Sequence, residues 1–206
     1  MKINLKKIEL SLLCGLIIAT SLSLTSFSAT CDNVRGDVLR MHIIANSDAP
    51  DDQALKLKVR DAVLTEGKDI FGKTLTSENA QELLLPRIDS LKESALKVIH
   101  DNGYNYDVKV QIGKDFFSTR TYDDKITLPA GTYEAVKVII GEGSGQNWWC
   151  VMFPPMCLPA AEGNNDEIKI DDVLSENEAN VVKSSPKFEP RFKIIEIYEK
   201  IVEKFK

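Results

Sequence analysis

This sequence of 206 residues contains few histidines and few cysteines, and its net charge is negative. There are two histidines, so any histidine-dependent catalysis must use His42 or His100. The 26 basic residues are outnumbered by 31 acidic ones, and the net charge of −5 argues against a nucleic-acid partner. Four cysteines cannot form a dense disulfide framework, but a hydrophobic content of 43% is enough to bury a core without one.

The N-terminus has the layout of a secretory signal. Three lysines precede a largely apolar run at residues 10–27, and the small residues Ser26 and Ser28 suit cleavage after position 28. The run is also just long enough to span a bilayer. Residues 1–28 are therefore predicted to be a signal peptide or an N-terminal membrane segment, with membrane association through residues 8–28 as the alternative to release. Their removal takes away three basic residues and one acidic residue and changes the net charge from −5 to −7.

The first element after the leader is predicted to be a strand at residues 38–44. Its alternation places apolar residues on a core face and Arg40 and His42 on the opposite, non-core face. Asn46-Ser47-Asp48 then offers caps for a helix that begins at Pro50 and ends before Gly67.

A second helix is expected from the cap at Ser77 to the stop at Asn102, kinked or split at Pro86. His100, at the end of this helix, is better explained as a cation that complements the helix dipole than as a catalytic residue. Strands are predicted at 104–112, 133–140 and 148–153, and a loop or short edge strand at 114–130.

The last two of these strands are expected to be neighbours joined by the loop Gly141–Gly145. That loop lacks the Gly-Lys-Ser/Thr ending of a phosphate-binding loop, and no helix follows it. The order predicts an α+β fold with helices packed on one face of a small, mostly antiparallel sheet, and with a C-terminal amphipathic helix. The predicted parts after the leader are a short lead-in at 29–37, a core domain at 38–159, an acidic polar linker at 160–189 and the amphipathic helix at 190–206.

Three segments carry a family resemblance: residues 39–64, which begin Leu-Arg-Met-His-Ile-Ile-Ala-Asn-Ser-Asp, residues 101–110, and residues 131–157, which contain Trp-Trp-Cys-Val-Met-Phe-Pro-Pro-Met-Cys. Together they resemble the stage II sporulation protein R family. The resemblance implies a protein made in the forespore and exported across its membrane into the intermembrane space. There it would trigger a membrane-embedded, aspartic-type protease of the mother cell that processes the precursor of sigma-E. No cofactor, metal or small-molecule substrate is expected.

Cys150 and Cys157 are predicted to form a disulfide in an oxidising exterior, because Pro154-Pro155 between them can turn the chain back. Buried free thiols are the alternative, and a metal site lacks a nearby histidine. Cys31 would then be left unpaired near the start of the mature chain, where it is clipped, lipidated or exposed.

Contact with the partner is the leading hypothesis, and its candidate residues are Arg40, His42, Asn46, Asp48, Trp148 and Trp149. An exported cell-envelope hydrolase that uses His42 with Ser47 and Asp48 is one alternative. A membrane-tethered envelope protein with an uncleaved leader is the other.

Overall fold

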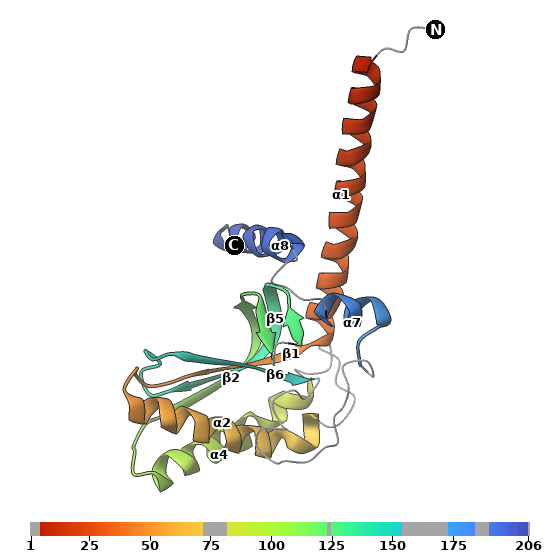
Figure 1. The fold of residues 1–206 in the computed structure, drawn as a ribbon. Helices are drawn as coiled ribbons and strands as arrows, with labels where there is room; N and C mark the ends of the chain where they lie inside the picture. Colours follow the sequence, from red (N-terminus) through yellow and green to blue (C-terminus); the bar gives the residue numbers. More distant parts are fainter. Residues whose placement is uncertain (1–4, 72–81, 123–124, 154–172, 184–189, 206) are drawn as a thin grey trace.

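The computed structural model describes residues 5–71, 82–122, 125–153, 173–183 and 190–205. Its centre is a four-stranded sheet in the order β2-β5-β1-β6 (Figure 1). The strands are β1 (Leu39–Ile44), β2 (Val108–Phe117), β5 (Gly131–Ile140) and β6 (Asn147–Phe153). β1 is parallel to β5, whereas β2 with β5 and β6 with β1 are antiparallel, so the predicted α+β class with a mostly antiparallel sheet is confirmed.

The strand order corrects one sequence-based prediction. Strands β5 and β6 are not neighbours, because β1 is inserted between them. The loop that joins β5 to β6 therefore crosses the end of β1 and is not a hairpin loop. Strand periodicity shows which side chains share a face, but it carries no information about which strands pair.

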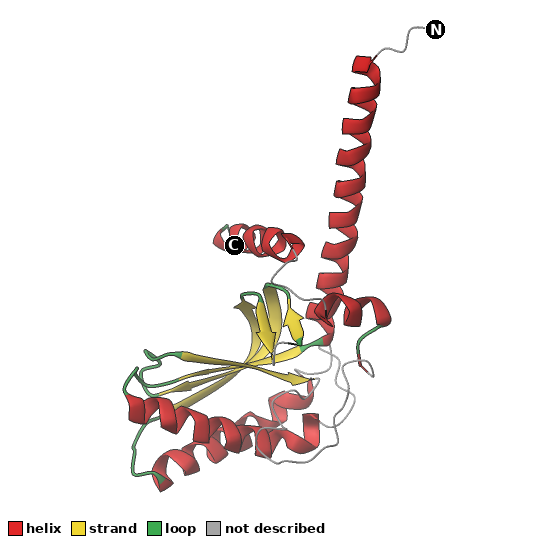
Figure 2. Cartoon of the chain, in the orientation of Figure 1, coloured by secondary structure: helices red, strands yellow, loops and turns green. Residues whose placement is uncertain are grey.

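Two helices cover one face of the sheet (Figure 2). They are α2 (Pro50–Phe71) and α4 (Ile88–Asp101), and α4 follows a single 3-10 turn, η1 (Leu85–Arg87). Pro86 lies in that turn, where it interrupts the helix as predicted. The predicted apolar stripes lie in the core beneath the helices, with these members fully buried: Leu55, Val59, Val63, Leu91, Ala95 and Ile99.

The opposite face of the sheet is covered as well, at the end near β1's start. A short hairpin of β3 (Arg120–Tyr122) and β4 (Ile126–Leu128) lies in the region expected to be a loop or edge strand, and β2 extends to Phe117. The helix α7 (Glu176–Lys183) packs there too, within the stretch 160–189 that was expected to be a linker. The residues of this second apolar cluster include Val34, Phe117, Leu128, Tyr133, Val151 and Val182.

A single long helix, α1 (Leu5–Asp37), includes both the predicted leader and the predicted lead-in. It is long and apolar enough to cross a membrane, a test that a signal sequence also passes. The first two-thirds of α1 project from the domain (Figure 1). In the last third, Phe27, Cys31 and Val34 are buried. The predicted C-terminal helix is present as α8 (Pro190–Lys204) and packs on this end of α1.

Candidate functional site

Two loops meet at the end of β1 and form one surface, which we call the loop platform: residues 45–48 and 141–146. Asn46 connects them, since its Oδ1 accepts a hydrogen bond from the Glu142 N–H at 3.0 Å and its carbonyl oxygen accepts one from the Ser144 hydroxyl at 2.7 Å. At the other end, Asp48 Oδ1 accepts from the Gln146 N–H at 2.7 Å. Asn46 and Asp48, two of the candidate contact residues, thus lie on this surface, and their partners in the second loop were not predicted from the sequence.

The platform is also fixed to the start of α2. The Asp52 carboxylate is buried and accepts hydrogen bonds from the Ser47 hydroxyl at 2.5 Å and from the Asn46 amide at 2.9 Å. Burial raises the pKa of Asp52, but these bonds and one from Tyr106 outweigh it and lower the pKa below its usual value. Lys56 Nζ donates to the Gln146 carbonyl at 3.0 Å, which fixes the second loop to the same helix.

Glycine makes this close approach possible. At Gly145 a Cβ atom would overlap the carbonyl oxygen of Ser47, and Gly141 adopts a positive φ of 54°. Every backbone N–H from Gly141 to Gln146 donates to an acceptor within the protein. The loop therefore has no free amide to bind a phosphate, in agreement with its sequence.

The two tryptophans of β6 point to opposite faces, as strand alternation predicts. Trp148 is 36% exposed beside the platform, with the Arg60 guanidinium 4.8 Å from its ring centroid. Trp149 is half-buried and stacks on His42 with ring centroids 3.8 Å apart. Trp148 is thus an aromatic side chain that a partner can reach at this end of the sheet.

His42 is buried, at 4% exposure, and its contacts correct the proposed catalytic set. Its Nδ1 lies 2.8 Å from Asp115 Oδ2, whereas the Ser47 hydroxyl is bonded to Asp52. The predicted set of His42, Ser47 and Asp48 is therefore not assembled. Ser47 Oγ donates to Asp52 and accepts from the Ala49 N–H, and Asp48 accepts from the Gln146 N–H, so both side chains have structural roles.

Asp115 belongs to a charged cluster that the sequence did not reveal, because its region was expected to be a loop. Lys137 Nζ lies 3.3 Å from the same carboxylate oxygen that faces His42. Burial raises the pKa of Asp115, but the His42 hydrogen bond and Lys137 more than compensate, and the pKa is lowered.

Arg40 is fully buried, although the sequence placed it on the non-core face. Its guanidinium carbon lies 4.0 Å from the ring centroid of Phe117 and 4.9 Å from that of Tyr133, and it donates to the Tyr122 hydroxyl. Among the residues that the structure describes, its Nε and Nη1 atoms have no hydrogen-bond partner. Arg40 and His42 are both buried on the face of the sheet that carries α7 and the hairpin of β3 and β4, so neither can contact a partner in this conformation.

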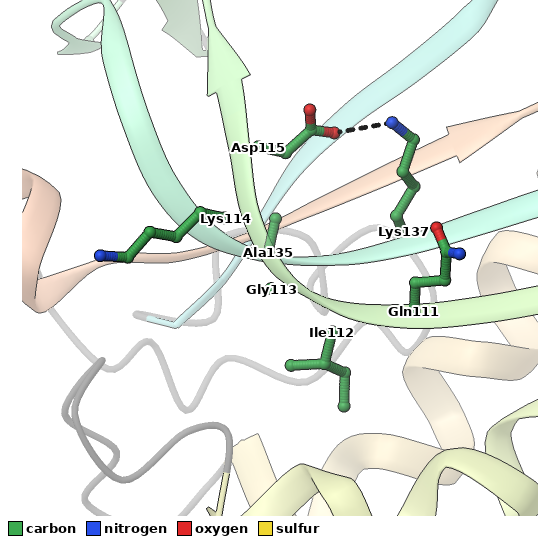
Figure 3. A pocket seen from close by; sticks show the side chains of 7 residues that line it. All are labelled: Gln111, Ile112, Gly113, Lys114, Asp115, Ala135 and Lys137. Carbon is green, nitrogen blue, oxygen red and sulfur yellow. Dashed lines mark ion pairs between the residues drawn. The ribbon is translucent and has the colours of Figure 1, made fainter. Parts of the chain in front are cut away.

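A hollow of about 450 Å³ lies beside β2 and β5 (Figure 3). Asp115 and Lys137 point toward one another across its rim, and Lys114 points away. The residues that line the hollow are Gln111, Ile112, Gly113, Lys114, Asp115, Ala135 and Lys137. None of these lining residues is a serine, a cysteine or a histidine. Across the described ranges, no group of three or more His, Cys, Asp or Glu side chains is placed to hold a metal ion.

Of the two cysteines predicted to form a disulfide, only Cys150 lies in the described part of the chain. Cys150 is buried on β6, and Cys157 lies outside the described residues, so their pairing stays a prediction. The free thiols in the described part of the chain are those of Cys14 and Cys31. Cys31 is fully buried between α1 and α8, and is thus neither exposed nor accessible in this conformation.

Comparison with known proteins gives one consistent result. The family model described as stage II sporulation protein R matches residues 35–163, the part that contains the sheet and the loop platform. Over 123 residues the chain is 39% identical to stage II sporulation protein R of Bacillus subtilis (strain 168), a match that covers 58% of this chain. The match spans about half the length of that curated relative, 53%. No solved structure matches.

Proposed function

The chain belongs to the stage II sporulation protein R family, and from this premise we propose that it is a sporulation signal that activates a membrane-embedded protease by contact. The proposed partner is the aspartic-type protease of the mother cell that processes the sigma-E precursor. The signal is exported across the forespore membrane into the intermembrane space, with α1 serving as signal peptide or anchor.

The single observation that supports contact is the loop platform with Trp148. Hydrogen bonds from two loops and from α2 hold its backbone in one conformation, so little conformational entropy is lost when it docks. Exposed tryptophan is a residue type that often dominates binding energy. The platform lies within the region matched by the family model.

The position of the platform suits a contact signal. α1 leads directly into β1, and the platform begins where the six residues of β1 end, which places it about 20 Å from the start of the strand. A protein held at α1 therefore presents the platform to one side of the point where α1 leaves the domain (Figure 1).

Activation by contact needs a defined amount of binding energy. Shifting a protease from a 1:99 to a 99:1 ratio of active to inactive molecules requires a difference in affinity of about 5.5 kcal/mol between the two states. One central aromatic contact contributes about 2 to 4 kcal/mol on truncation to alanine. Loss of Trp148 alone should thus remove a large part of the activation.

The test adds the full chain to vesicles that carry the matching protease and the sigma-E precursor, and measures precursor cleavage. Cleavage should depend on the added chain and fall steeply with Trp148→Ala, and less with Gln146→Ala on the same surface. Glu93→Ala, an exposed change on α4, is the control and should retain full activity. Full activation by a folded Trp148→Ala, Gln146→Ala double variant would exclude the platform as the contact.

A further inference from the structure

α8 is fixed to α1 at the point where α1 leaves the domain. Phe192 and Phe27 meet edge to face with ring centroids 5.2 Å apart, and the Arg191 guanidinium lies 4.6 Å from the Phe27 centroid. Arg35 Nη2 forms an ion pair with Glu199 at 3.2 Å. Cleavage after Ser28 would remove Phe27 from this contact and leave Cys31 and Arg35, so part of the packing of α8 depends on a retained α1.

The opposite face of α8 is apolar and exposed. Phe192 and Ile195 are its buried residues, whereas large apolar side chains at spacings of three and four residues are left outside. The exposed set runs along α8 and just beyond it: Ile194, Ile197, Tyr198, Ile201 and Phe205. Phe205 is 83% exposed, and leaving so many large apolar groups in water is costly.

The neighbouring part of α1 points to what covers this face. The exposed large apolar side chains of α1 are Ile8, Leu10, Leu12, Leu13, Leu16, Ile17, Ile18 and Leu22, all in the segment able to cross a membrane. α8 lies crosswise at the base of that segment, on the side of the domain from which α1 projects (Figure 1). The two apolar surfaces therefore belong to helices that pack on one another where α1 leaves the domain.

The charges of α8 suit the boundary between water and lipid. The helix holds four basic and three acidic residues, so it is nearly neutral and would bind lipid mainly by burying its apolar face. Lys193 and Lys200 flank that face, are mostly exposed and form ion pairs with Glu196 at 3.4 and 2.6 Å. Such lysines can lay their aliphatic stems along the apolar surface and direct the charge to the headgroups.

We infer that α8 is an interfacial helix, which lies in the surface of the same bilayer that α1 crosses, with Ile194, Ile197 and Ile201 among the side chains inserted below the headgroups. The two helices together form a membrane anchor that fixes the orientation of the domain. This inference does not rest on the identity of the protease.

The test uses the full chain reconstituted in phosphatidylcholine vesicles that contain lipids brominated at shallow or deep acyl positions. Tyr198→Trp adds a fluorophore to the exposed face of α8, and the parent chain gives the background from Trp148 and Trp149. We expect loss of the added fluorescence with shallow bromines and less loss with deep ones. Glu93→Trp on α4, on the far face of the sheet, is the matched control and should not be quenched.

Two results would overturn the inference. Added fluorescence at position 198 that is no more quenched than at position 93 would place the face of α8 outside the lipid. Protection of that face by a second copy, seen as concentration-dependent cross-linking between chains without quenching, would assign it to self-association instead. Neither result bears on precursor cleavage, so the activation mechanism is tested separately.

Discussion

Asn46→Ala is expected to loosen the loop platform, because this one side chain connects both loops to α2. The change removes the acceptor for the Glu142 N–H at 3.0 Å and the donor to the Asp52 carboxylate at 2.9 Å. A neutral hydrogen bond contributes about 1 kcal/mol and one to a charged group about 1.5 to 3 kcal/mol, so the free energy of unfolding should fall by about 2.5 to 4 kcal/mol at pH 7.

The loss should depend on pH, because most of it concerns the hydrogen bond to the Asp52 carboxylate. In the parent chain the pKa of Asp52 is lowered overall, since the hydrogen bonds from Ser47, Asn46 and Tyr106 outweigh the effect of burial. A lowered pKa gives stability that is present above the unfolded pKa of about 3.9 and is lost as the pH falls through the folded value. The difference between Asn46→Ala and the parent should therefore be full at pH 7 and shrink below about pH 4.

Urea unfolding of the full chain in detergent, at pH 7 and at pH 3, measures both effects. Asn46→Asp is the matched comparison, because its carboxylate can still accept from Glu142 but faces Asp52 with a second negative charge. It should be destabilised at pH 7 and recover strongly at pH 3. The reasoning would be refuted by a change for Asn46→Ala of less than about 0.5 kcal/mol at pH 7, which is the size of an ordinary surface effect.

Three further predictions follow from the same contacts. Gly145→Ala should reduce precursor cleavage more than it reduces overall stability, because its Cβ would overlap the Ser47 carbonyl and separate the two loops; equal cleavage by variant and parent would contradict this. His42→Ala should lower the free energy of unfolding by about 2 to 4 kcal/mol through loss of the Asp115 bond and of a buried ring, yet leave cleavage intact at temperatures where it is folded; abolished cleavage by the folded variant would support the hydrolase alternative. If Cys150 is paired as predicted, alkylation of the unfolded, unreduced chain should label two of the four cysteines, and labelling of all four would exclude the disulfide.

Local sequence patterns predicted the elements well and their assembly less well. The caps before Pro50 and the apolar stripe through Leu91, Ala95 and Ile99 identified the helices, because both signals lie within one or two turns of chain. The burial of Arg40 and His42 could not be predicted this way. It results mainly from α7 and the β3 to β4 hairpin, which lie far from β1 in sequence, together with the end of α1.

The candidate site shows the same division. Asn46 and Asp48 were proposed from the cap pattern, and strand alternation placed the two tryptophans on opposite faces without showing which one is exposed. Asn46, Asp48 and Trp148 all reach the surface at one end of the sheet. The partner loop was visible in sequence as Gly141-x-Gly-x-Gly145, a signal of tight backbone approach, but only the strand order revealed that it crosses the end of β1.

Site-specific photo-crosslinking tests the central claim most directly, because it asks whether the platform touches the protease. A photoreactive side chain in place of Trp148 is compared with one in place of Glu93, in full chains that both activate precursor cleavage. The account predicts a covalent product with the protease from position 148 and none from position 93. A product from position 93 alone, or no product from position 148 while the precursor is cleaved, would contradict contact through the loop platform.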